Sequence, residues 1–129
     1  MWRLTVALVA FVTATSAIAA AATFIGLRKL AERPADYVGQ TVRTCGWARN
    51  GFEEQWISVA RYPYAPDGTI APGFEVDWHK RAERTAQGES EWRCISGHVE
   101  PTCGPLPETD TAVCVSTGSP YGWKIVQEF

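Results

Sequence analysis

Apolar residues are concentrated at the start of this chain. Residues 1–22, which end in a run of small side chains, carry one charge on Arg3 and an apolar stretch at Leu4–Val12. This order is typical of a cleavable export signal, whose peptidase accepts small residues at alternate positions. The uncharged stretch Leu4–Ile25 also approaches the ~20 residues of a membrane-spanning helix, so an uncleaved anchor is the alternative. We expect cleavage, which leaves residues 23–129 as a single domain without a membrane span.

In the remainder of the chain, apolar and polar residues follow the spacings of helices and strands, as in a folded domain. Apolar residues recur at helical spacing between Phe24 and Glu32, which predicts a short N-terminal helix that ends before Pro34. Five later segments combine β-branched and aromatic residues with turn residues at their borders, and they predict strands. These segments are Thr41–Ala48, Gln55–Tyr62, Phe74–His79, Trp92–Val99 and Trp123–Phe129. The pattern therefore predicts an all-β domain with a short N-terminal helix.

Two stretches between the predicted strands lack a clear period. Lys80–Glu91 is polar and charged, which predicts either a weak helix or a solvated loop. Pro101–Gly122 is rich in proline and glycine around one apolar patch, Ala112–Val115. We interpret it as a long connection with room for one short extra strand.

The cysteines predict a protein braced by disulfides. Four of them follow the export signal and none forms a Cys-x-x-Cys motif, which favours structural bridges over a redox site or a zinc ribbon. In the first and fourth predicted strands, Cys45 and Cys94 lie on the side opposite the apolar residues. Their sulfur atoms meet if these strands are antiparallel neighbours. Four cysteines allow three connectivities, of which we favour Cys45–Cys94 with Cys103–Cys114.

Charge and motifs exclude several classes of function. The net charge of −2 provides no basic excess to neutralise a phosphate backbone, so nucleic acid is not the expected ligand. Asp77 and His79 share one side of a strand, but no third ligand follows at a spacing typical of a metal site. Ser96 and His98 are two residues apart, which does not make a catalytic triad. We therefore expect no metal, no cofactor and no catalytic residues.

Two glycine-containing motifs resemble small exported bacterial OB-fold proteins. The first is Pro-x-x-Tyr-Val-Gly-Gln-x-Val-x-x-x-Gly at Pro34–Gly46, and the second is Cys-Ile-Ser-Gly-His-Val at Cys94–Val99. Gln40 stands where these proteins usually have lysine. The resemblance covers residues 27–99 and implies a five-stranded, OB-like small barrel in a periplasmic or secreted protein.

The same resemblance implies where a ligand would bind. In OB folds the face of the second and third strands binds oligonucleotides or oligosaccharides by stacking rings and by contacts to charge. The candidate ligand-binding residues near these strands are Trp56, Arg61, Tyr62, Tyr64, His79, Lys80 and Arg81. In the alternative interpretation, the rings pack in the core or at its rim and the charges are simply solvated.

The fold alone does not determine the activity, because OB folds have many functions. We expect a non-catalytic exported binding or assembly module of the cell envelope, with an envelope protein as its partner. The first alternative is a protein that binds an oligosaccharide or another polymer ligand. The second is a small secreted hydrolase. Exposed rings on the second and third strands favour the polymer, carboxylates or imidazoles converging in a cleft favour the hydrolase, and a featureless polar barrel favours the interaction module.

Overall fold

The computed structural model describes residues 21–102 and 120–128 of the chain. The elements in chain order are β1 (Thr23–Phe24), α1 (Leu27–Glu32), the 3₁₀ helix η1 (Pro34–Tyr37), β2 (Thr41–Asn50), β3 (Gln55–Ser58), β4 (Gly73–Asp77), β5 (Glu91–Pro101) and β6 (Trp123–Gln127). Within these two ranges no helix is long and apolar enough to cross a membrane. The predicted bridge Cys103–Cys114 and the possible strand at Ala112–Val115 lie outside the described residues.

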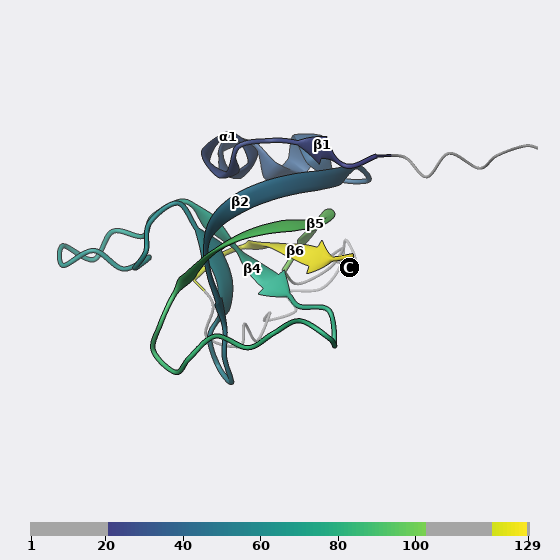
Figure 1. Ribbon diagram of the computed structural model, residues 1–129. Helices are drawn as coiled ribbons and strands as arrows, with labels where there is room; N and C mark the ends of the chain where they lie inside the picture. The colour runs from purple at the N-terminus through teal and green to yellow at the C-terminus, as the bar shows by residue number, and fades with distance from the viewer. Residues whose placement is uncertain (1–20, 103–119, 129) are drawn as a thin grey trace, which may run out of the picture.

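Five of the strands close into a small barrel (Figure 1). β2, β3 and β4 are joined as antiparallel neighbours, β4 pairs in parallel with β6, β6 pairs antiparallel with β5, and β5 returns antiparallel to β2. This mixed order is that of an OB-like barrel. The predicted fold class, an all-β barrel with a short N-terminal helix and a disulfide, is therefore confirmed.

The alternation of side chains along each strand fills the barrel with apolar residues. The inward side chains that are almost completely buried are Val42, Ile57, Phe74, Val76, Ile95, Val99 and Ile125. Leu27 and Leu30 of α1 join this core. A Cβ atom at Gly46 would lie 2.6 Å from the side chain of Leu27, so glycine at this position allows α1 to pack closely against β2.

The predicted cross-strand disulfide is present on the outside of the barrel. Cys45 of β2 lies directly opposite Cys94 of β5, and the bonded pair has its Cα atoms 3.9 Å apart. Cys94 is exposed and Cys45 is half-buried, whereas their neighbours Thr44 and Ile95 point into the core. The antiparallel pairing of the first and fourth predicted strands is thus confirmed along with the bridge.

The predicted start of the N-terminal helix is wrong by three residues. Thr23 and Phe24 form β1, which pairs in parallel with Val42 and Arg43 of β2, and α1 begins only at Leu27. The cause is an open backbone edge, because β3 pairs only with residues 47–50 of β2. A short extended segment gains backbone hydrogen bonds at this edge that an extra helical turn would not make.

The predicted second strand is too long at its C-terminal end. It was expected to reach Tyr62, but β3 ends at Ser58, the last residue paired with β4. The hydroxyl of Ser58 accepts a hydrogen bond from the backbone N–H of Ala60 at 3.2 Å, which turns the chain away from the ladder. The loop of residues 59–72 then projects from the barrel, on the left in Figure 1.

Candidate functional site

Two tryptophans lie together on the outer side of β2 and β5. Trp47 is paired with Trp92 in the antiparallel ladder, two residues from the disulfide on each strand. Their ring centroids are 5.6 Å apart and the ring planes meet at 81°, an edge-to-face contact. Trp47 is half-buried, but Trp92 keeps 59% of its surface exposed. An open aromatic ring is therefore held beside a covalently fixed strand pair.

An exposed arginine covers the ring of Trp47. The guanidinium carbon of Arg61 lies 5.4 Å from the Trp47 ring centroid, within the range of a cation–π interaction. The backbone near Arg61 is held in place because the Ser90 hydroxyl donates a hydrogen bond to the Arg61 carbonyl oxygen at 2.8 Å. Arg43 lies on the same side of β2 and donates a hydrogen bond to the Ser96 hydroxyl at 3.3 Å. We call the surface formed by Arg43, Trp47, Arg61 and Trp92 the Trp–Arg face.

A second cation–π pair lies next to this face, between β2 and β3. The guanidinium carbon of Arg49 lies 5.2 Å from the ring centroid of Trp56, which is 5% exposed. Arg49 also donates to the Glu54 carboxylate, to the Gly88 carbonyl oxygen at 3.0 Å and to the Ser90 hydroxyl at 3.4 Å. Trp56 is thus covered by a well-bonded arginine and presents no open ring to a ligand.

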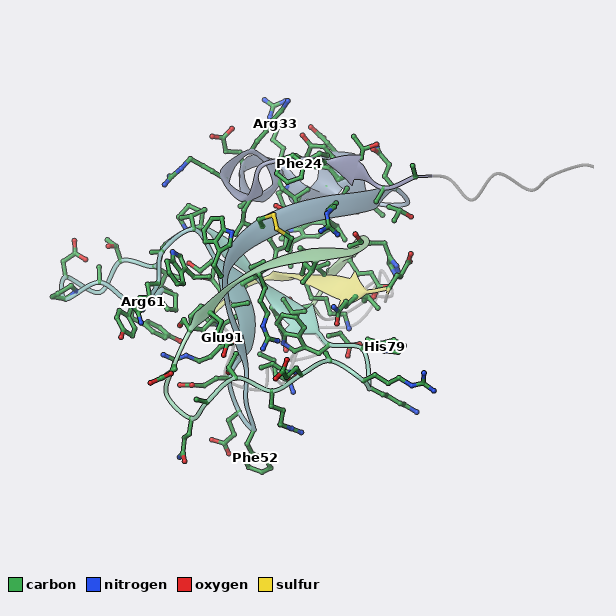
Figure 2. The ribbon with its side chains drawn as sticks, viewed as in Figure 1. Phe24, Arg33, Phe52, Arg61, His79 and Glu91 are labelled. Atoms are coloured by element: carbon green, nitrogen blue, oxygen red, sulfur yellow. A yellow bond between two sulfur atoms is a disulfide. The ribbon has the colours of Figure 1, made fainter. Side chains whose placement is uncertain are left out.

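Apart from Trp56, the structure divides the predicted ligand-binding residues into two groups. Arg61, Tyr62 and Tyr64 follow the end of β3, whereas His79, Lys80 and Arg81 follow the end of β4. Because β3 and β4 are antiparallel, the chain segments that follow them leave opposite ends of the barrel. Figure 2 shows Arg61 and His79 on opposite sides of the molecule.

Each group has a different environment. Tyr62 and Tyr64 are both exposed and continue from Arg61 into the projecting loop. The backbone N–H of His79 donates to the side-chain oxygen of Gln127 at 2.9 Å, and the ring Nδ1 of His79 accepts from the Arg81 backbone N–H at 3.3 Å. The first group therefore adjoins the Trp–Arg face, and the second belongs to a turn at the other end.

Trp47 and Trp92 were not among the predicted ligand-binding residues, although a signal for them existed. The predicted antiparallel pairing of Cys45 with Cys94 implies that the residues two positions further along β2 and two positions earlier in β5 also lie opposite each other. Those residues are Trp47 and Trp92, on the same outer side as the sulfur atoms. Strand register alone would have placed both rings on the surface.

A histidine paired with two carboxylates lies farther along β5. The Nδ1 atom of His98 is 2.6 Å from the Glu128 carboxylate, and its Nε2 atom is 2.7 Å from the Glu100 carboxylate. The hydrogen bond with Glu128 raises the pKa of His98 above its ordinary value of 6.5. Burial opposes this rise, and Glu100 adds to it. Both ring nitrogens are engaged, and Ser96 bonds to Arg43, so Ser96 and His98 do not form a nucleophile and base pair.

Two of the surface hollows among the described residues are large enough to consider as ligand sites. One of about 590 Å³ lies between the β2–β3 turn and residues 84–88, beside the fully projecting ring of Phe52. The other, of about 370 Å³, lies between α1 and Tyr121. Neither is lined by a predicted ligand-binding residue. Across residues 21–102 and 120–128, no group of three or more histidine, cysteine, aspartate or glutamate side chains is arranged to hold a metal ion.

Comparison of this chain with protein-family models, curated proteins and solved structures found no match. Its predicted membership of the small exported OB-fold proteins therefore stays a prediction. The geometry of the Trp–Arg face is the basis for assigning a function.

Proposed function

We propose that this protein is a non-catalytic binding module of the bacterial cell envelope, and that it contacts an envelope protein through the Trp–Arg face. The observation that carries the proposal is the exposed ring of Trp92 next to the guanidinium of Arg61. Tryptophan, tyrosine and arginine are the residues that contribute most of the binding energy at protein interfaces. A cluster of them on an otherwise solvated sheet indicates a contact surface.

The supports around the face favour binding without rearrangement. The Cys45–Cys94 disulfide fixes the strands that carry both tryptophans. The Ser90 hydroxyl connects the backbone beside Arg61 to the buried Arg49 side chain. A surface that is already ordered loses less conformational entropy when a partner binds, so more of the contact energy appears as affinity.

A protein that binds an oligosaccharide or another polymer is the second candidate. The open ring of Trp92 favours it, because a sugar ring can stack on such a surface. However, polymer-binding surfaces usually stack successive units on several rings. Within the Trp–Arg face, Trp47 meets Trp92 edge to face and is itself covered by Arg61, so Trp92 is the one open ring of the face, with the exposed Tyr62 and Tyr64 on the adjoining loop. A hydrolase has less support, since the described Ser96 and His98 are engaged elsewhere.

Export is the location that the proposal requires. The predicted signal at residues 1–22 supports a periplasmic or secreted protein. The Cys45–Cys94 disulfide supports an oxidising compartment, because such bridges are rare in proteins that stay in a reducing cytosol.

Co-sedimentation with isolated bacterial envelopes tests the proposal. Wild-type protein should sediment with envelopes, Trp92→Ala should remain in the supernatant, and Phe52→Ala should behave as wild type. Phe52 is the matched control because its ring is 89% exposed at the β2–β3 turn and lies outside the Trp–Arg face. Sedimentation that does not depend on Trp92 would contradict the proposal. Digestion of the envelopes with protease beforehand should abolish binding, whereas retained binding would favour the polymer.

A further inference from the structure

We infer that the partner of the Trp–Arg face is an acidic, extended segment of a protein, which places carboxylates at Arg43 and Arg61 and an apolar side chain against Trp92. This inference rests on the proposed function and specifies the chemistry of the partner.

The outer side of the sheet around the tryptophans carries positive charge. The outward positions of β2 from Arg43 to Arg49 and of β5 from Trp92 to Ser96 include two arginines and no acidic residue. Arg49 already has a carboxylate partner in Glu54. In the described part of the chain, Arg43 and Arg61 have none. The face is therefore positive and complementary to an anionic group.

The Arg61 guanidinium is held in a position in which it can bind a carboxylate. Its guanidinium lies over the Trp47 ring, which orders the side chain while leaving the N–H groups at its edge for a ligand. Arginine binds a carboxylate through two parallel hydrogen bonds when its plane is ordered in advance. A lysine in place of Arg61 would have neither a planar group to stack on the Trp47 ring nor paired N–H donors for a carboxylate.

The spacing between Arg43 and the tryptophans along β2 determines the length of the ligand. Arg43 and Trp47 are four residues apart in β2, which corresponds to ~13 Å in an extended chain. A carboxylate at Arg43 and an apolar group at the tryptophans thus require an extended segment of about four residues. A peptide with an acidic and an apolar side chain four positions apart meets this requirement, because both then lie on the same side of the extended chain. The open ring of Trp92 suits one apolar side chain.

Selection from random peptides displayed on phage tests this inference without knowledge of the partner. Peptides are selected on wild-type protein after depletion on Trp92→Ala, and the enriched sequences should contain aspartate or glutamate an even number of positions from an apolar residue. A synthetic copy of the best peptide is then titrated by calorimetry, together with a version in which amides replace its carboxylates. We expect the amide version to bind at least ~10-fold more weakly, as for the loss of one charge-assisted contact.

Variants of the protein complete the test. The variant Arg61→Gln should bind the acidic peptide ~10-fold more weakly or worse. Arg33→Gln is the matched control, because Arg33 is an exposed arginine that follows α1, outside the face. Enriched peptides without acidic residues, or equal affinity for Arg61→Gln, would overturn the acidic partner and leave the proposed function intact. No enrichment over Trp92→Ala would overturn the inference, and envelope co-sedimentation would then decide the proposed function separately.

Discussion

Replacing both Cys45 and Cys94 by serine should remove a large part of the stability of this domain. The bridge joins residues 49 positions apart, and closing a loop of that length removes about 4 kcal/mol of chain entropy from the unfolded state. Both sulfur atoms lie on the outer side of the sheet, so the substitution leaves no cavity in the core. Domains of this size are stable by ~5–15 kcal/mol, so the double variant should still fold.

Urea unfolding followed by far-UV circular dichroism measures this effect. With a slope of ~2 kcal/mol per molar urea, the midpoint of the double variant should fall by about 2 M. The variant Cys103→Ser with Cys114→Ser provides a comparison. Its predicted loop of about 11 residues should contribute about 3 kcal/mol, a smaller loss. A midpoint shift below ~0.5 M for the Cys45 and Cys94 variant would refute the reasoning, because the bridge would then not restrict the unfolded chain.

Three other substitutions test the packing and the ion pairs. Gly97→Ala should destabilise the barrel by ~2–3 kcal/mol in urea unfolding, because its Cβ would lie 2.1 Å from the Val126 carbonyl oxygen; an unchanged midpoint would be incompatible with this contact. Phe74→Ala should cost ~3–5 kcal/mol, since this ring is buried in the core, and a loss below ~1 kcal/mol would place it elsewhere. The pKa of His98 is raised in the folded state by Glu128, so this pair stabilises the fold fully below pH 6.5 and loses its effect as pH rises through the folded pKa. Thermal melts should show a smaller stability loss over this range for His98→Gln, and identical pH profiles would argue against the pair.

The alternation of side chains was sufficient to predict the buried faces of the strands and the bridge, whereas the barrel was predicted from the resemblance to OB-fold proteins. In the first and fourth strands, the same alternation separates the apolar residues from the cysteines, so the pairing of Cys45 with Cys94 follows once the strands are neighbours. The helix start could not be predicted, because residues 23–24 pair with an edge of β2 that exists only after the barrel has closed. Local helical spacing carries no information on that edge.

The candidate site was predicted less well than the fold. The separation of Arg61 from His79 follows from the antiparallel order of two consecutive strands and could have been deduced. The burial of Trp56 could not have been deduced, because it depends on Arg49. This charged side chain is held over the ring by hydrogen bonds to Glu54 and Ser90. A charged side chain that shields a ring leaves no apolar pattern in the sequence.

Hydroxyl-radical footprinting of the protein bound to envelopes tests the central claim most directly, because it requires no identified partner. The oxidation of Trp92 and of Phe52, both exposed in the free protein, is measured by mass spectrometry with and without envelopes. A binding surface at the Trp–Arg face predicts that bound protein is protected at Trp92 and oxidised as before at Phe52. Equal oxidation of Trp92 in the two states, or protection of Phe52 instead, would contradict it.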